Sequence, residues 1–272
     1  MSILLETHDL TVSYGGLHAN SNVTIKAEKG MVTGLIGPNG AGKTTFIDAI
    51  TGFTNVSSGR AEFKGADLAG VTPAERAKIG LVRTFQSLEL FEDLTVWDNL
   101  LVMAEETKWW SFLADIVKPN RVLGVEEGVE WALNFLSLGE YRDRLTLDLS
   151  HGQRKLVSVA RALAARPEML LLDEPAAGLD TVESQQLGKH LREILTEGIS
   201  IFLIDHDMGL VLSVCDYIYV LDFGNIIAEG TPDQVRNDPE VKRAYLGETA
   251  GEMQAEDGAA AARSLSGEGS NQ

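Results

Sequence analysis

The stretch Gly-Pro-Asn-Gly-Ala-Gly-Lys-Thr-Thr at residues 37–45 constrains the fold more than any other part of this chain. It follows an apolar run, residues 32–36, that reads as a buried strand. It opens into a segment where Phe46, Ile47 and Ile50 recur at helical spacing. A strand, a glycine-rich loop, a Lys-Thr pair and a helix, in this order, form the context of a phosphate-binding loop (P-loop). The pattern therefore predicts a nucleoside triphosphate site.

Residue types in the P-loop match what phosphate binding requires. Glycines allow backbone N–H groups to surround phosphate oxygens, and the helix N-terminus adds partial positive charge. Lys43 is expected to reach the β- and γ-phosphates, and the Thr44 hydroxyl to ligate Mg²⁺. The alternative is a glycine-rich turn without a ligand, which does not need the Lys-Thr pair. The predicted nucleotide contacts in the loop are Gly37, Pro38, Asn39, Gly40, Ala41, Gly42, Lys43, Thr44 and Thr45.

Composition restricts the class of protein. A hydrophobic content of 44% and a mean hydropathy of −0.01 are typical of a globular chain, and no run approaches the roughly 18 apolar residues of a membrane span. The net charge of −17 argues against general nucleic-acid binding, which needs a basic surface. A single cysteine, Cys215, excludes an internal disulfide, and we expect it to be a small buried side chain. These features indicate a cytoplasmic protein that does not bind nucleic acid.

Strand and helix patterns alternate along the chain. Short alternating segments before residue 31 predict antiparallel strands, whereas later apolar runs separated by helices predict a mostly parallel sheet covered by helices. These later strands are predicted at residues 169–172, 200–204 and 217–221. Residues 88–165 are largely helical and charged. From residue 248 onward the sequence is rich in Ala, Gly, Ser and Glu, which predicts a disordered acidic tail.

Two carboxylates, Asp173 and Glu174, follow directly after an apolar strand. If this strand lies beside the P-loop strand, Asp173 reaches the Mg²⁺ and Glu174 reaches the γ-phosphate. Glu174 could there orient and deprotonate the attacking water, which is general-base catalysis. Alone, two acids at a strand end could simply mark a turn. The upstream P-loop favours the catalytic interpretation.

The segment around Ser150 begins an amphipathic helix. Ser150 and Gln153 have the spacing of a capping box, so ordinary helix capping is one interpretation. Capping alone does not require Gly152, nor the cationic pair Arg154 and Lys155 so near the positive end of a helix. A second anion site is the other interpretation. Its natural occupant is a phosphate that a partner chain holds.

The order of these motifs resembles the ATP-binding cassette of ABC transporters, over about residues 4–247. The P-loop is followed by Gln86, the helical insertion, Leu-Ser-x-Gly-Gln, Asp-Glu-Pro, a Gly-Leu-Asp triplet and His206. The resemblance implies an α/β P-loop NTPase fold with a mostly parallel core sheet, an N-terminal antiparallel β subdomain and an inserted helical subdomain. The implied domains are one cassette, residues 1–247 with the helical part at about 88–165, and the tail at 248–272.

The resemblance also implies roles within the chain's own nucleotide site. Tyr14 stacks on adenine, Gln86 senses Mg²⁺, and His206 holds the γ-phosphate of ATP. Tyr14 has an alternative as a plain strand residue, because strict alternation places it on one face with Leu10 and Val12. For Gln86 the alternative interpretation is a surface polar residue at a strand end. For His206 the alternative is a metal cluster with the neighbouring aspartates, but no other His or Cys has ligand spacing there.

A second set of implied roles belongs to a dimer of cassettes. Ser150, Gly152 and Gln153 contact the nucleotide of the opposing subunit, and Asp180 crosses the interface. One departure from the family lies here, because His151 replaces the usual glycine of the Leu-Ser-Gly-Gly-Gln signature. The partner cassette is either a second copy of this chain or a paralogue.

Finer motifs resemble the ATP-binding subunits of branched-chain amino acid importers, with urea and short-amide importers similar. They include Arg-Thr-Phe-Gln at residues 83–86, the His-Asp-Met triplet at 206–208 and Ile-Ala-Glu-Gly-Thr-Pro at 227–232. Asp205 departs from the pattern, since a glutamate often precedes this histidine. The acidic tail is an addition that the resemblance does not explain.

The implied function is an ATP hydrolase on the cytoplasmic face of the cell membrane. It drives import through separate transmembrane permease subunits, and indirectly an extracytoplasmic substrate-binding protein takes part. The alternative is a soluble ABC ATPase that acts on a macromolecular assembly. Relatives of that class carry long coiled coils or two cassettes in one chain, and this sequence has neither sustained heptads nor a second P-loop.

Overall fold

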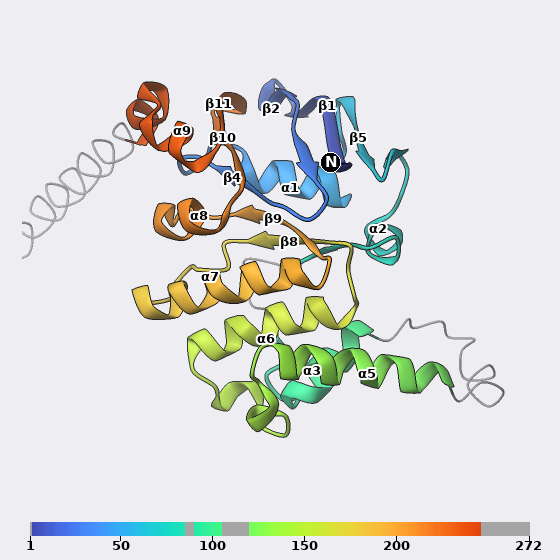
Figure 1. Cartoon of the computed structure of the whole chain (residues 1–272). Helices are drawn as coiled ribbons and strands as arrows, with labels where there is room; N and C mark the ends of the chain where they lie inside the picture. The colour runs from blue at the N-terminus through green and yellow to red at the C-terminus, as the bar shows by residue number, and fades with distance from the viewer. Residues whose placement is uncertain (1, 85–89, 105–119, 246–272) are drawn as a thin grey trace, which may run out of the picture.

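The computed structural model describes residues 2–84, 90–104 and 120–245, and the strands in these ranges form two sheets (Figure 1). The predicted contact residue Gln86 and the tail at 248–272 lie outside the described residues. The smaller sheet has the order β2-β1-β5-β6, with β3 also paired to β1, and all of its pairs are antiparallel. Its strands are β1 (Ile3–Tyr14), β2 (Leu17–Val23), β3 (Lys26–Glu28), β5 (Ser58–Phe63) and β6 (Ala66–Asp67).

The larger sheet has the order β11-β10-β4-β9-β8-β7, and every neighbouring pair in it is parallel except β10 with β11. Its strands are β4 (Val32–Ile36), β7 (Leu81–Arg83), β8 (Met169–Asp173), β9 (Ser200–Ile204), β10 (Tyr217–Asp222) and β11 (Asn225–Gly230). The predicted strands at 169–172, 200–204 and 217–221 are thus present, two of them one residue longer than predicted.

One prediction about this sheet is wrong. We expected β8, which leads to Asp173 and Glu174, to lie beside the P-loop strand β4. Instead β9 lies between them, because Leu203 pairs with Gly34 on one side and with Leu172 on the other. All three strands are completely buried, so their apolar sequences carry no mark of which strands are neighbours.

Helices cover both faces of the larger sheet. Helix α1 lies between the two sheets, whereas α6, α7 and α8 lie on the opposite side, and α3 and α5 pack beyond them on α6 (Figure 1). Side chains alternate between the two faces along β8. Met169 and Leu171 pack in the core with α1 and the antiparallel sheet, whereas Leu170 and Leu172 pack in the core with α6 and its neighbours. The helices are α1 (Lys43–Thr51), α2 (Pro73–Lys78), α3 (Val96–Ala104), α5 (Asn120–Phe135), α6 (His151–Ala164), α7 (Thr181–Thr196), α8 (Met208–Val214) and α9 (Pro232–Asn237).

The segment between β7 and β8 is a helical unit built from α3, α5 and α6, with two short 3₁₀ turns, Gly139–Tyr141 and Thr146–Asp148. Buried side chains such as Leu100, Leu133 and Leu163 join the three helices. This is the α/β fold that the sequence predicts, with a mostly parallel core sheet, an N-terminal antiparallel sheet and inserted helices. Within the described ranges, no helix has the length and apolarity that crossing a membrane requires.

Candidate functional site

The P-loop connects β4 to α1, and two of its glycines are required by their surroundings. Gly37 has a φ of +155°, and a Cβ there would lie 2.0 Å from the carbonyl oxygen of Leu221. Gly42 has a φ of +105°, and a Cβ there would lie 2.3 Å from the carbonyl oxygen of Ala19. Because L residues rarely adopt this backbone and the space is filled, no side chain fits at either position. The loop is therefore held tightly by β10 and β2.

Helix α1 begins at this loop without a side-chain cap. Its N-cap is Gly42, which has no side chain that could accept from the N–H groups of the first turn. Lys43 is buried, and its Nζ donates to the carbonyl oxygens of Gly37 at 2.7 Å and Pro38 at 2.9 Å. The Thr44 side chain is exposed. The start of α1 thus combines a helix N-terminus that has no side-chain cap with an ammonium group, and both are features of an anion site.

A cavity of about 530 Å³ lies over the start of α1. It brings the P-loop together with Glu174, which comes from the end of β8 two strands away. Its lining residues are Leu17, His18, Ala19, Asn39, Gly40, Ala41, Gly42, Lys43, Thr44, Thr45, Glu174, Phe223 and Gly224. The sequence prediction had not included Leu17, His18, Ala19 or the turn at Phe223 and Gly224, because β2 and β10 reach the loop only through the tertiary fold.

The backbone of Glu174 has a φ of +48°, a left-handed conformation that is uncommon for a residue with a side chain. Its N–H donates to Ile204 O at 2.8 Å, and its carbonyl oxygen accepts hydrogen bonds from Lys155 Nζ at 3.1 Å and Ala177 N at 3.2 Å. Such strain persists where neighbouring groups hold it, and it concentrates at functional sites. His206 is close by, with its Nδ1 3.8 Å from Glu174 Oε2.

Asp173 does not line the cavity but is buried behind it, 2% exposed. Its Oδ2 accepts a hydrogen bond of 2.7 Å from Arg83, which also pairs with Asp48 of α1. Burial raises the pKa of Asp173, and the hydrogen bond and charge of Arg83 oppose this shift. Sequence reasoning had given Arg83 and Asp48 no role. The available signal was Arg83 itself, a basic residue at the end of an apolar strand, which could have indicated a partner for a buried carboxylate.

The aspartate before His206 has a structural task. Asp205 is completely buried, and its carboxylate accepts hydrogen bonds from Ala176 N at 3.0 Å and Asp207 N at 2.9 Å. Burial raises the pKa of this carboxyl group, and the two backbone hydrogen bonds oppose the shift. The residue thereby ties the end of β9 to the loop after Glu174. No group of three or more His, Cys, Asp or Glu able to hold a metal occurs in the described part of the chain, so the metal-cluster interpretation of His206 gains no support.

Ser150 and Gln153 form the predicted capping box at the start of α6. Ser150 Oγ accepts from Gln153 N at 3.2 Å, and Gln153 Oε1 accepts from Ser150 N at 2.9 Å. A Cβ at Gly152 would lie 2.4 Å from Glu183 Oε1, so a side chain here would require the end of the Glu183 side chain to shift. The ring of His151 turns toward its own chain, with Nε2 3.2 Å from Ala177 O. None of these residues lines the P-loop cavity.

Two further predicted residues also lie away from that cavity. Asp180 is the N-cap of α7, where Oδ1 accepts from Val182 N and Glu183 N, both at 2.8 Å. Tyr14 is 55% exposed at the end of β1, and its hydroxyl lies 3.2 Å from Thr54 Oγ1. Tyr14 is thus a residue of β1, but unlike Leu10 and Val12 it is exposed, and its contact with adenine stays a prediction.

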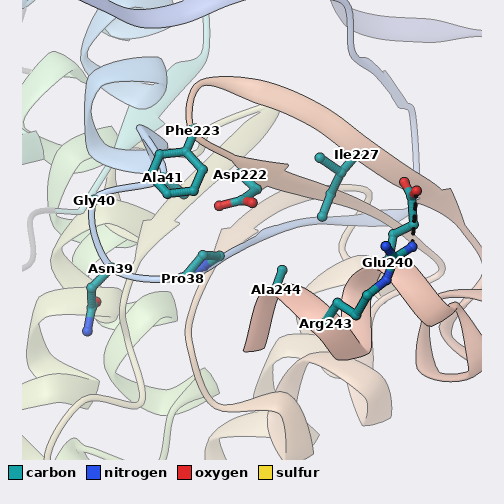
Figure 2. Close-up of a pocket in the computed structure, with 10 residues that line it drawn as sticks. All are labelled: Pro38, Asn39, Gly40, Ala41, Asp222, Phe223, Ile227, Glu240, Arg243 and Ala244. Atoms are coloured by element: carbon teal, nitrogen blue, oxygen red, sulfur yellow. Dashed lines mark hydrogen bonds and ion pairs between the residues drawn. The ribbon is translucent and has the colours of Figure 1, made fainter. Parts of the chain in front are cut away.

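A second cavity, of about 560 Å³, lies on the other side of the P-loop (Figure 2). There Pro38 lies toward the helical segment at residues 239–245, and the Phe223 ring lies beside Ala41. Its lining residues are Pro38, Asn39, Gly40, Ala41, Asp222, Phe223, Ile227, Glu240, Arg243 and Ala244. Because neither Lys43 nor Glu174 is among them, the first cavity is the candidate nucleotide site.

Comparisons with known proteins agree with this geometry. A family model described as "ABC transporter" matches residues 20–177, and one described as "Branched-chain amino acid ATP-binding cassette transporter" matches residues 225–251. The high-affinity branched-chain amino acid transport ATP-binding protein BraF of Pseudomonas aeruginosa is 39% identical, over 90% of this chain and 98% of its own length. LivG of Escherichia coli, with the same description, is 38% identical over the same shares.

Solved structures show the same fold. The ADP conformation of MJ1267, described as an ATP-binding cassette of an ABC transporter, superposes with a TM-score of 0.81 at 34% identity. The match covers 91% of this chain and all of that one. A nucleotide-free ATP-binding cassette from an ABC transporter gives a TM-score of 0.79 at 35% identity, over 90% of this chain and 99% of the other.

Proposed function

The chain belongs to the ABC transporter family, and we propose that it is the ATP-hydrolysing subunit of an importer for branched-chain amino acids. The match of residues 225–251 to the branched-chain model and the descriptions of BraF and LivG support this substrate class. The observation that carries the catalytic part is the single cavity in which the P-loop residues Lys43 and Thr44 meet Glu174.

In this proposal the phosphates of ATP lie at the start of α1. The uncapped N–H groups of its first turn and the buried Lys43 neutralise the phosphate charge. The exposed ring of Tyr14 stacks on adenine. Leu17 lines the cavity from the beginning of β2 and contributes an apolar contact on the side of the nucleoside.

We assign the Mg²⁺ that accompanies ATP to the Thr44 hydroxyl and the Asp173 carboxylate, with Gln86 as a third ligand from the family resemblance. The donor types fit this ion, because Mg²⁺ prefers oxygen ligands and usually keeps few protein ligands beside phosphate oxygens and waters. A cluster of three carboxylates is therefore not required. Thr44 lines the cavity, whereas Asp173 lies behind it with one carboxylate oxygen bound to Arg83. When bound, the ion neutralises charge on the phosphates.

Glu174 is the proposed general base. Its carboxylate accepts the proton of the water that attacks the γ-phosphate, a contribution of roughly 10²–10⁴-fold to the rate. His206, whose Nδ1 is 3.8 Å from Glu174 Oε2, holds the γ-phosphate beside it. Lys43, Gln86 and His206 share the task of neutralising the charge that develops during transfer.

Ser150, Gly152 and Gln153 act on a different nucleotide, the one bound by a partner cassette. Their position outside the chain's own cavity supports this division of roles. Asp180 contributes from the same side at the cassette interface. The pair, formed with a second copy or a paralogue, acts at the cytoplasmic face of the membrane on separate permease subunits, and an extracytoplasmic binding protein delivers the solute to them.

Copurification tests this proposal. Tagged protein is extracted from its own cell membranes with a mild detergent, and the accompanying chains are identified by mass spectrometry. Permease-like chains and a second cassette are the expected partners, and their complex is expected to hydrolyse ATP faster when a branched-chain amino acid and its binding protein are added. Ribosomal or assembly factors in place of permeases would contradict the transport role.

A further inference from the structure

Helix α6 contacts the loop after β8 through two side chains on one helical face. Lys155 Nζ donates to the carbonyl oxygen of Glu174 at 3.1 Å, and His151 Nε2 lies 3.2 Å from Ala177 O. The two residues are four positions apart, so they lie one above the other on the helix. Both acceptors belong to the loop that joins Glu174 to Asp180. The helix that begins at Ser150 is thus attached to the segment that carries the proposed base.

The Lys155 contact is unusual in its environment. The residue is 6% exposed, and burial lowers the pKa of its ammonium group, while the nearby carboxylates of Asp205 and Glu174 act in the opposite direction. A buried ammonium has a desolvation cost that an apolar side chain of equal length avoids. Packing alone therefore does not call for a lysine here. What the lysine adds is a hydrogen-bond donor directed at one carbonyl group.

That carbonyl group belongs to the strained residue of the site. At a φ of +48°, the direction of the Glu174 side chain depends on the bonds that hold its backbone. Ile204 O of β9 holds the N–H from one side at 2.8 Å, and Lys155 holds the carbonyl from the side of α6. The same carbonyl oxygen also accepts a hydrogen bond from Ala177 N at 3.2 Å, so loss of the Lys155 bond removes the contact with α6 and loosens this peptide group without freeing it.

We propose that Lys155 is a positioning residue for Glu174, and that Lys155 and His151 together couple the Ser150 end of α6 to that base. Since five residues of a helix span only about 7.5 Å, a shift of α6 at Ser150 is transmitted to Lys155 with little loss. Binding of the partner's nucleotide at Ser150 thereby adjusts the base that hydrolyses this chain's own ATP. The inference rests on the proposed function, because it takes Glu174 as the base and Ser150 as the contact to the partner.

The test is Lys155→Met in the complete complex, with Lys155→Arg as the conservative variant. Methionine fills the space without a donor, so kcat for ATP is expected to fall roughly 10- to 100-fold, the range that small misplacements of a catalytic group produce. KM for ATP stays within about twofold, because the phosphate contacts are unchanged. The melting temperature stays equal or rises. Arginine restores a donor and most of kcat, and Lys189→Met on the exposed side of α7 serves as the matched control with no effect.

Two results for Lys155→Met itself would overturn the inference. One is a kcat within about twofold of wild type, and the other is a lowered melting temperature with a parallel rise in KM, which indicates a structural role. Glu174→Gln in the same assay separates the two proposals. If Glu174→Gln retains normal turnover, the base assignment fails and the inference fails with it. If Glu174→Gln is inactive but Lys155→Met is not, the inference alone fails. The double variant Glu174→Gln with Lys155→Met is expected to associate with the partner cassette in the presence of ATP, as Glu174→Gln does. Loss of this association would also contradict a positioning role for Lys155.

Discussion

Two helices of this protein begin at proposed phosphate sites, yet they treat their first N–H groups in opposite ways. Helix α1 starts at Gly42 with no side-chain cap, and Gly37 and Gly42 of the loop cannot be replaced because backbone oxygens fill the space beside them. Helix α6 starts at Ser150 with a complete capping box from Gln153. An end without a side-chain cap leaves its first donors to a ligand or to water, whereas the capping box satisfies two of the donors at the start of α6.

The difference suggests how the two sites divide their work. The α1 site is built to hold a phosphate within its own chain, with Lys43 enclosed in the loop. At the α6 site, Ser150 and Gln153 cap the helix while the cassettes are apart, and a phosphate binds there only when a partner cassette brings one. A contact that competes with an existing cap is weak and reversible, which suits a pair that closes and separates in each cycle.

The largest expected effect tests the α1 site. Lys43→Ala removes the ammonium group of the loop, so turnover is expected to fall by roughly 10³-fold or more, with weakened ATP binding. Phosphate release and equilibrium binding of ATP measure the two effects. Lys29→Ala changes an exposed lysine and is the control with normal turnover. Wild-type hydrolysis by pure Lys43→Ala protein would show that the start of α1 is not the phosphate site.

Glu174→Gln tests whether the two sites act together. Glutamine keeps the size of glutamate but cannot accept the proton of water, so hydrolysis is expected to slow by roughly 10²-fold or more. ATP still binds at α1 and bridges to the partner's Ser150 end, so the closed pair persists. Size-exclusion chromatography with the native partner cassette is expected to show an ATP-dependent shift from monomer to dimer, while wild type shows little.

Either of two outcomes for Glu174→Gln would be informative. Normal hydrolysis would mean that Glu174 is not the base. An inactive variant that never associates with its partner in ATP would contradict the shared site, and the capped end of α6 would then be no more than a helix terminus.

Arg83→Met tests the support behind the α1 site. Removing one member of a buried ion pair is expected to cost about 3–5 kcal/mol, because the Asp173 carboxylate stays buried without its cation. Burial already raises the pKa of Asp173, and the opposing effect of Arg83 is lost in the variant. A carboxyl group with a raised pKa in the folded state binds its proton more tightly there, so acidification relieves the cost.

The stability difference between Arg83→Met and wild type is therefore expected to be largest near neutral pH and to shrink as the pH falls toward the raised pKa of Asp173. Urea unfolding of both proteins across this pH range measures it. Arg83→Lys keeps a charge but cannot bridge Asp173 and Asp48 at once, so an intermediate cost is expected. If the stability difference between the two proteins does not change with pH, the protonation of Asp173 is not its cause.

The P-loop itself can be recognised in the sequence because its parts are local. Its strand, glycines and lysine all lie within residues 32–45. The cap of α6 is local as well, because it depends only on Ser150 and Gln153. Tyr14 shows where local rules fail. Strict alternation puts it with Leu10 and Val12, but β1 shifts register after each of these residues and leaves Tyr14 exposed.

What the sequence did not predict is set by distant partners. The position of β9 between β4 and β8 depends on pairing among three equally apolar strands. The contacts of Lys155 and His151 with the Glu174 loop join side chains to carbonyl groups 19 and 26 residues away in the chain. Such pairs leave no periodic signal, so only the tertiary structure shows that α6 and the Glu174 loop are connected.

The smallest expected effect sharpens the comparison of the two helix ends, and it uses a matched pair of caps. Ser150→Ala and Thr72→Ala each remove the hydroxyl of a capping box, the first on α6 and the second on α2, away from the P-loop cavity. Each is expected to lower the free energy of unfolding by about 1 kcal/mol, since this is the usual contribution of such a cap. The melting temperatures of the two variants should fall by similar amounts.

The rates of ATP hydrolysis should differ. In the presence of the partner cassette, the hydrolysis rate of Ser150→Ala is expected to fall roughly tenfold, which corresponds to one hydrogen bond to a charged group, while ATP binding by the isolated chain is unchanged. Thr72→Ala should hydrolyse ATP at the wild-type rate. Equal turnover in both variants would reduce Ser150 to a cap, and weaker ATP binding by isolated Ser150→Ala would mean that Ser150 serves its own chain's site and not the partner's.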